Sequence, residues 1–230
     1  MNILAIDTTT KFLCLGIYKQ GKVFELNEEL GTRHAELLIP KLKTLLKKAA
    51  LDITDIDYFA CAIGPGSFTG IRIGLSTAKG LAFGLNRPLM GIPSLDILAR
   101  NVSEKEETLV CPVIDARRAL VYSCLYKIKE NKYKKISKYL LISPDDLLKK
   151  LNHKQRVVFL GDGLKLYRDL IFQKLGKNAV FLDEKLWYPK AGNILALGRE
   201  LLKKKKAFDA LKIKPLYLYP KECQIQTKKR

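Results

Sequence analysis

The sequence predicts an α/β protein made of two similar halves, each with the element order βββαβαβα. Three strand-like hydrophobic runs open the chain, and three more follow a polar link at residues 103–108. Matching dipeptides also recur at an offset of 108 residues: Ile6-Asp7 corresponds to Ile114-Asp115, and Tyr18-Lys19 to Tyr126-Lys127. The repeated order and the repeated dipeptides together indicate a duplicated fold with one lobe at residues 1–102 and another at 103–230.

Hydrophobic periodicity and turn residues define the elements of the first half. Apolar alternation predicts strands at 2–7, 12–19 and 22–29, and a helical period follows at 33–50. We expect Thr32 to cap that helix and Pro40 to bend or restart it, because proline has no N–H to donate to the preceding turn. The half then continues with a strand at 58–63, a helix at 67–85, a strand at 89–92 and a short helix capped by Ser94.

The second half repeats this order, starting with strands at 109–115, 120–127 and 133–141. Ser143-Pro144-Asp145-Asp146 then marks a helix start, because it combines a capping hydroxyl, a proline in the first turn and a carboxylate three residues after the cap. The remaining elements are expected as a strand at 156–160, a helix at 164–175, a strand at 179–182 and a helix at 193–206. This last helix is a candidate to pack back on the first lobe.

Two such halves in tandem point to the two-lobed architecture of actin, Hsp70 and sugar kinases (the ASKHA group, with ribonuclease H-like lobes). That resemblance implies a nucleotide site between the lobes, held by the first hairpin of each half. The candidate nucleotide-binding residues at those positions are Asp7, Thr8, Thr9, Asp115 and Arg117. Phosphate cradles usually need glycine, and neither hairpin contains one, so we expect an eroded site. An equally weighted interpretation is that Asp7 and Asp115 only cap tight strand turns.

The segment GPGSFTGIRIG at residues 64–74 is the most distinctive motif. Its first three residues break a buried strand, and Ser67 or Thr69 can cap the helix that follows. Small residues then recur every four positions on one stripe of that helix, at Gly70, Gly74, Ala78 and Ala82. A glycine inside a helix costs roughly 0.5–1 kcal/mol relative to alanine, so the stripe needs a purpose. Tight packing on the protein's own sheet and docking of another subunit's helix both remain open.

The charge of the chain is strongly positive and unevenly distributed. The formal net charge is +19; residues 1–100 contain 12 basic and 9 acidic side chains, and residues 101–230 contain 30 and 14. The second half could therefore contact RNA. Lysine accounts for 32 of the 42 basic residues, so a lysine-rich solvated surface explains the excess as well. The runs at 203–206 and 228–230 sit at a helix end and a chain end, where cations complement the helix dipole or are simply solvated.

Several classes of protein are disfavoured by composition. The five cysteines form no CxxC pair, and four of them lie in strand-like runs, which fits small buried side chains in a reducing cytoplasm. No apolar run reaches about 18 residues, so we expect no membrane span. The two histidines, His34 and His153, are far apart in sequence and offer no ligand pair for a metal. No GxSxG motif supports a peptidase.

Five motifs together resemble the TsaB family, also called YeaZ, of bacterial accessory proteins for threonylcarbamoyladenosine in tRNA. They are IDTTT at 6–10, RHAELLIP at 33–40, GPGSFTGIRIGLSTAKGLA at 64–82, IDARR at 114–118 and PLYLYP at 215–220. The catalytic paralogue, TsaD, shares the glycine-rich segment but has a metal-binding histidine pair, and the corresponding residues 91–98 contain no histidine. The terminal family motif often ends in arginine, whereas this chain has Tyr217-Leu218-Tyr219.

The resemblance implies a non-catalytic scaffold that pairs with a TsaD-type subunit and works with a TsaE-type ATPase. It also implies that the chain can form a homodimer alone, needs no cofactor of its own, and leaves ATP or ADP and the metal to its partners. The implied substrate is the adenosine beside the anticodon of tRNAs that read codons starting with A. The alternative is an ATP-binding kinase or hydrolase that uses Asp7 and Asp115.

The resemblance also implies a partner face on the helices at 33–50 and 67–85. Its predicted residues are His34, Leu38, Leu42, Leu45, Phe68, Gly70, Ile71, Gly74, Thr77, Ala78 and Leu81.

Overall fold

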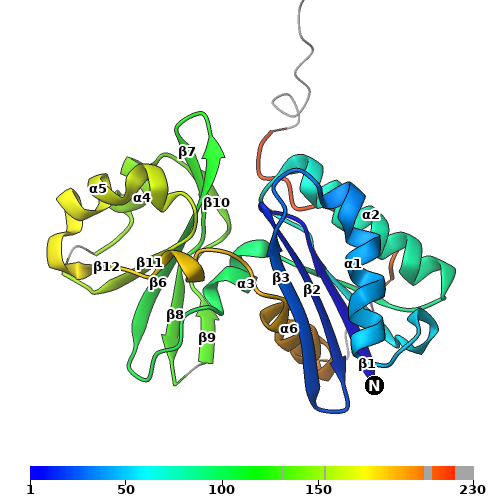
Figure 1. The fold of residues 1–230 in the computed structure, drawn as a ribbon. Helices are drawn as coiled ribbons and strands as arrows, with labels where there is room; N and C mark the ends of the chain where they lie inside the picture. Colours follow the sequence, from blue (N-terminus) through cyan, green and yellow to red (C-terminus); the bar gives the residue numbers. More distant parts are fainter. Residues whose placement is uncertain (131, 153, 205–208, 221–230) are drawn as a thin grey trace, which may run out of the picture.

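The computed structural model describes residues 1–130, 132–152, 154–204 and 209–220, which form two lobes that lie side by side (Figure 1). The first lobe contains a five-stranded sheet of order β3-β2-β1-β4-β5. Its elements are β1 (Asn2–Asp7), β2 (Phe12–Lys19), β3 (Lys22–Glu29), α1 (His34–Lys48), η1 (Ile53–Asp55), β4 (Tyr58–Ala62), α2 (Phe68–Gly84), β5 (Leu89–Ile92) and α3 (Ser94–Ala99).

The second lobe contains a seven-stranded sheet whose main path is β10-β7-β6-β11-β12, with β8 and β9 added beside β6. Its elements are β6 (Thr108–Arg117), β7 (Leu120–Ser123), β8 (Tyr126–Lys129), β9 (Lys132–Lys135), β10 (Leu140–Ile142), α4 (Pro144–Lys149), β11 (Val157–Leu160), α5 (Leu164–Leu175), η2 (Gly176–Asn178), β12 (Ala179–Phe181) and η3 (Glu184–Leu186), and α6 (Ala191–Lys203) follows. The element order therefore matches the duplicated layout in outline.

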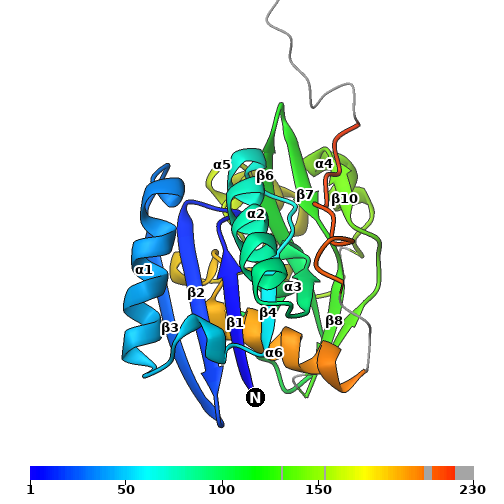
Figure 2. The ribbon, with the colours of Figure 1, turned by 90° about the vertical axis from the view of Figure 1, so that its right-hand side faces the viewer.

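The first sheet is covered on both faces, which explains why β1 is hydrophobic without interruption. Leu4 and Ile6 face the cluster that also contains residues of α1 and α2, whereas Ile3 and Ala5 face a cluster with Ile194 of α6. Figure 2 shows α1 and α2 side by side over one face of this sheet. The final helix thus packs on the first lobe, although the chain reaches it only after completing the second.

Two predicted strands of the second half are each divided in two, which corrects the predictions of 120–127 and 133–141. β7 pairs with the end of β6, and β8 pairs with its beginning, so Cys124 and Leu125 form a break between them. Ile136 donates its N–H to the Leu125 carbonyl (2.9 Å), and Leu125 donates its N–H to the Ser137 hydroxyl (2.9 Å). The break in one predicted strand is thus hydrogen-bonded to the break in the other. Hydrophobic periodicity along a single strand does not reveal such a pairing.

The helix boundaries confirm some capping predictions and correct others. Ser67 accepts the N–H of Gly70 (3.1 Å), and Ser143 accepts the N–H of Asp146 (3.2 Å), as expected. The predicted caps at Thr32 and Ser94 are wrong: α1 follows Arg33 with no side-chain cap, and Ser94 is the first residue of α3. α1 also does not restart at Pro40, which lies inside one uninterrupted helix.

Cys14, Cys61, Cys111 and Cys124 are buried free thiols, whereas Cys223 and His153 lie outside the described residues. The basic run at 228–230 and Lys205 and Lys206 also lie outside them, so the predicted helix end at 206 falls there. Among the residues that the structure describes, no helix is long and apolar enough to cross a membrane.

The small residues of α2 allow its first turns to lie directly on the turn between β1 and β2. A Cβ on Gly70 would overlap the carbonyl oxygen of Thr8, and a Cβ on Gly74 would overlap the Thr8 hydroxyl. Gly80, by contrast, has nothing within 4 Å of the position its Cβ would take. Gly70 and Gly74 therefore allow close packing, whereas Gly80 in the same helix lies in open space.

We expect Gly70→Ala to lower the free energy of unfolding by roughly 1–3 kcal/mol, because the new methyl group forces α2 away from the turn. Gly80→Ala is its matched control and should raise that free energy by about 0.5–1 kcal/mol, since alanine is the better helix former in open space. Chemical denaturation of the two variants measures both effects. A stable Gly70→Ala protein would contradict the close packing.

Candidate functional site

A cleft of about 650 Å³ lies between the two lobes. It is bounded by the turn after β1, the glycine-rich loop before α2, the turn after β6 and the end of the described chain. The residues that line it include Thr9, Thr10, Lys11, Pro65, Gly66, Ser67, Phe68, Asp115, Arg117, Arg118, Tyr122, Asp162, Tyr217 and Tyr219. The structure therefore brings together the two hairpins that the sequence analysis singled out.

Asp7 is enclosed at the end of β1 and does not line the cleft. Its side chain accepts the N–H of Thr9 through Oδ1 (2.6 Å), and its buried Oδ2 has no hydrogen-bond partner among the described residues. Burial raises the pKa of this carboxyl from 3.8 to about 6. Asp7 thus caps the turn that follows β1, which agrees with the turn-cap interpretation.

The two threonines that follow are joined to the glycine-rich loop. The Thr8 hydroxyl donates to the Gly70 carbonyl (2.6 Å), and the Thr9 carbonyl accepts the N–H of Ser67 (2.8 Å). Ser94 donates its hydroxyl to that of Thr9 (3.2 Å). The side chains of Thr8, Thr9 and Ser94 are buried, whereas Ser67 is exposed. The threonines serve the packing of α2 on the turn.

The turn after β6 has the same aspartate arrangement but a different backbone. Asp115 accepts the N–H of Arg117 (2.8 Å) and forms an ion pair with its guanidinium (3.3 Å). Arg117, Arg118 and Ala119 are consecutive residues with φ of 67°, 52° and 56°, a region that side chains other than glycine seldom adopt. Such a backbone persists only where surrounding contacts hold it.

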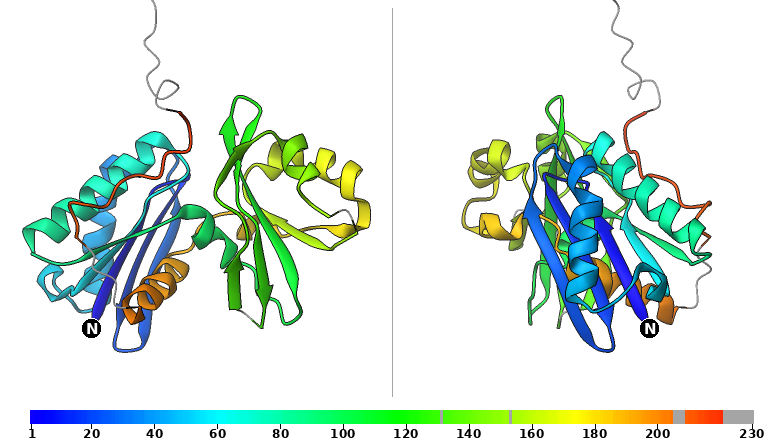
Figure 3. Two further views of the ribbon diagram at one scale, coloured as in Figure 1. Left: turned by 180° about the vertical axis from the view of Figure 1, so that it is seen from behind. Right: turned by 45° about the vertical axis from the view of Figure 1, so that its right-hand side comes forward.

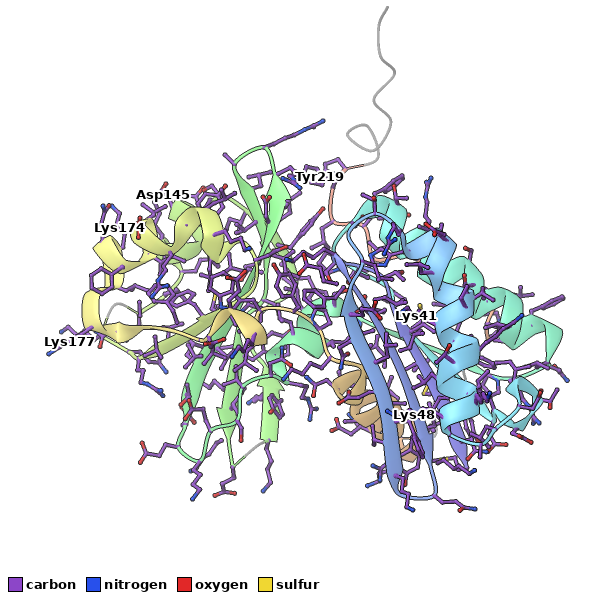
Figure 4. All side chains as sticks on the ribbon, in the orientation of Figure 1. Lys41, Lys48, Asp145, Lys174, Lys177 and Tyr219 are labelled. Carbon is purple, nitrogen blue, oxygen red and sulfur yellow. The ribbon has the colours of Figure 1, made fainter. Side chains whose placement is uncertain are left out.

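The holding contact comes from the C-terminal strap, which we define as residues 209–220. Tyr219 donates its hydroxyl to the carbonyls of Ala116 (2.9 Å) and Arg117 (3.3 Å), and its ring meets that of Tyr122 edge-on at 6.1 Å. Figure 4 labels Tyr219 between the two lobes, and this residue lines the cleft. One side chain of the strap thus holds the strained turn of the second lobe through two hydrogen bonds.

The strap fixes the opposite side of the cleft as well. It runs along α2 (Figure 3), where Leu216 donates its N–H to the Ile63 carbonyl (2.7 Å). The ring of Tyr217 lies 5.1 Å from that of Phe68, and its hydroxyl accepts Arg72 Nε (3.2 Å). The strap therefore contacts both sides of the cleft, the first lobe through Leu216 and Tyr217 and the second lobe through Tyr219.

These residues do not fit a magnesium–nucleotide complex held in the manner of the actin-like fold. The carboxylate of Asp7 is buried and does not line the cleft, the hairpin turns contain no glycine, and Tyr217 and Tyr219 form part of the cleft wall. In the part of the chain that the structure describes, no three His, Cys, Asp or Glu side chains form a group that could hold a metal ion.

Most residues of the predicted partner face lie inside the first lobe, which corrects the choice of residues. The small stripe packs on Thr8 and on the core, because α2 turns that side toward the sheet. The buried members of the prediction are His34, Leu38, Leu42, Leu45, Gly70, Ile71, Gly74 and Ala78. Phe68, Thr77 and Leu81 retain exposed surface. His34 is held by a hydrogen bond between Nε2 and the Thr10 carbonyl (2.8 Å).

A different face of α1 and α2 is exposed, and the sequence analysis missed it. Ser76, Gly80 and Gly84 follow each other at intervals of four on the solvent side of α2, and Phe83 beside them is 67% exposed. Ile39 on α1 is 42% exposed. Gly80, a glycine inside the predicted helix but outside the small-residue stripe, is a sequence signal for this face, but spacing alone does not show which stripe faces outward.

The two lobes and the cleft define a duplicated actin-like protein, and the comparisons with known proteins agree. A family model described as TsaD, tRNA N6-adenosine threonylcarbamoyltransferase, matches residues 27–227. Two relatives carry the name tRNA threonylcarbamoyladenosine biosynthesis protein TsaB. That of Bacillus subtilis is 32% identical over 98% of this chain and 97% of its own, and that of Escherichia coli is 30% identical over 95% and 94%.

The solved structure of YeaZ from Pseudomonas aeruginosa superimposes with a TM-score of 0.83 at 28% identity, covering 94% of this chain and 99% of that one. The chain belongs to the TsaB (YeaZ) family. The resemblance stated from its motifs and the predicted fold class are both confirmed.

The raised pKa of Asp7 predicts an unusual pH dependence. Between pH 4 and 6 the folded state holds a proton on Asp7 that the unfolded state has released, so the free energy of unfolding falls as pH rises through this window. At pH 7.5, Asp7→Asn should therefore raise that free energy by roughly 1–3 kcal/mol. The two proteins should converge near pH 4. A constant difference across pH 4–8, measured by denaturant unfolding, would contradict the assignment.

Proposed function

We propose that this chain is a non-catalytic subunit of the cytoplasmic machinery that transfers a threonylcarbamoyl group to the adenosine beside the anticodon of tRNAs that read codons starting with A. A TsaD-type partner would carry the catalytic metal and nucleotide, and a TsaE-type ATPase would act on the complex. The family name supports the pathway, and free buried cysteines fit a reducing compartment.

The observation that carries the non-catalytic role is the state of the cleft. The family model that matches the chain describes a transferase, and the actin-like fold would place its chemistry between the lobes. In this chain Asp7 is buried beneath its own turn, and Tyr217 and Tyr219 line the cleft. The same features weigh against a kinase or hydrolase that uses Asp7 and Asp115. The chain then requires no cofactor of its own.

The surface that supports a partner is the outer face of α1 and α2, formed by Ile39, Ser76, Gly80, Phe83 and Gly84. Exposed Phe83 offers a large apolar anchor, and interfaces often depend on a few such aromatic side chains. The glycines beside it leave room for a partner's helix to approach closely. The same face would serve a TsaD-type subunit in the complex and a second copy of this chain when it is alone.

The test replaces Phe83 by glutamate and measures both binding of the TsaD-type subunit and modification of unmodified tRNA. We expect binding to weaken by at least about 30-fold, equivalent to about 2 kcal/mol, and modification to fall in parallel at limiting protein. The matched control is Leu166→Glu, because Leu166 is 63% exposed on α5 of the other lobe.

Leu166→Glu should leave both readouts unchanged. Full binding by a folded Phe83→Glu protein would refute the outer face. If the Phe83→Glu protein no longer binds the TsaD-type subunit but modification is undiminished, modification does not require the complex of the two proteins, and the proposed function is refuted.

A further inference from the structure

The β8–β9 ribbon carries four lysines on one face. The strands are antiparallel, with Lys127 opposite Lys134 and Lys129 opposite Lys132. Directly opposite residues share a face, and side chains along each strand alternate, so all four lysines point to the same side. The other face holds Tyr126 and Ile128, both buried. We call Lys127, Lys129, Lys132 and Lys134 the lysine ribbon.

This arrangement is unfavourable for the isolated protein, because like charges directly opposite each other destabilise a strand pair. Lys127 pairs with Glu107 (2.9 Å) and Lys132 with Glu130 (3.6 Å), both at the exposed surface. Among the described residues, Lys129 and Lys134 have no ion-pair partner within 4.0 Å. The hydrogen bond and charge of Lys127 lower the pKa of Glu107, with smaller contributions from Lys129 and Lys134. Several ribbon lysines thus act on one carboxylate.

Protection of a sheet edge explains only part of the ribbon. β9 is an edge strand, since it pairs with β8 alone, and lysines on an edge strand discourage pairing with other chains. β8 is not an edge, because it lies between β6 and β9, yet it supplies two of the four lysines. Figure 1 shows these strands at the far end of the second sheet from β7. The charges on the inner strand therefore need another reason.

We propose that the lysine ribbon binds the phosphate backbone of a structured RNA. Neighbouring lysines on one strand are separated by about 6.6–6.8 Å, and each is a flexible point charge suited to phosphate contacts that do not depend on base sequence. The ribbon has four positive charges, and Glu107 and Glu130 supply two negative ones beside it. It also lies in the half of the chain in which basic residues strongly outnumber acidic ones. The choice of RNA over another polyanion rests on the proposed function.

The experiment measures the affinity of the full chain for an unmodified tRNA transcript by fluorescence anisotropy between 50 and 200 mM salt. The test variant is Lys129→Gln/Lys134→Gln, which removes one lysine from each opposed pair. The matched control is Lys174→Gln/Lys177→Gln, because both of these lysines are exposed at the distant end of the same lobe (Figure 4).

We expect the ribbon variant to bind RNA at least 10-fold more weakly at low salt, with the slope of log affinity against log salt reduced by about 1.4–1.8. The control variant should match the parent chain. The ribbon variant should also unfold at no lower temperature than the parent, since it loses two repulsive contacts. An equal loss in both variants, or an unchanged salt slope, would overturn the proposal.

Tighter, ribbon-dependent binding to vesicles of anionic lipid than to tRNA would also overturn it. A modification assay separates this proposal from the proposed function. If tRNA binds through the ribbon but omitting the chain leaves modification unaffected, the proposed function fails and the RNA surface stands. If omitting the chain abolishes modification but the ribbon variant binds tRNA normally, the proposed function stands and the RNA surface fails.

Discussion

The packing of Gly70 and Gly74 against Thr8 determines how α2 and the β1–β2 turn fit together in the first lobe. It brings the first turns of α2 onto the end of β1, where a side chain at either glycine would collide with the turn. The hydrogen bond from Thr8 to the Gly70 carbonyl and that from Ser67 to the Thr9 carbonyl then lock loop and turn together. Because this side of α2 packs on the turn and the core, the opposite side, with Gly80 and Phe83, is exposed to solvent or to a partner.

The second consequence concerns the cleft. The glycine-rich loop is hydrogen-bonded to the β1–β2 turn, and it lines one side of the cleft. The strap then joins this loop, through Tyr217 and Phe68, to the strained turn of the second lobe, through Tyr219. The fold thus has the two-lobed arrangement of an actin-like protein, and the strap forms part of the wall of the cleft between the lobes.

Much of the fold could be predicted from the sequence, because the elements of the first lobe have strong local signals. The strands at 2–7, 12–19 and 22–29 and the Ser67 cap follow from alternation and capping chemistry. The division of the strands around Cys124 and Ser137 depends on which part of β6 each piece pairs with, and local pattern does not contain that information.

The candidate site was harder for the same reason. A spacing of four places residues on one stripe of a helix but does not decide whether the stripe faces the core. The strap has no periodicity, so the roles of Tyr217 and Tyr219 emerge only from their partners across the cleft.

Reconstituted modification of unmodified tRNA, with this chain present, omitted, or supplied alone, distinguishes a non-catalytic subunit from an enzyme. We expect modification only when the chain and the other transfer components are combined, and none from the chain alone. Modification by the chain alone would make the cleft an active site and contradict the non-catalytic role. Unchanged modification when the chain is omitted would contradict its place in the machinery.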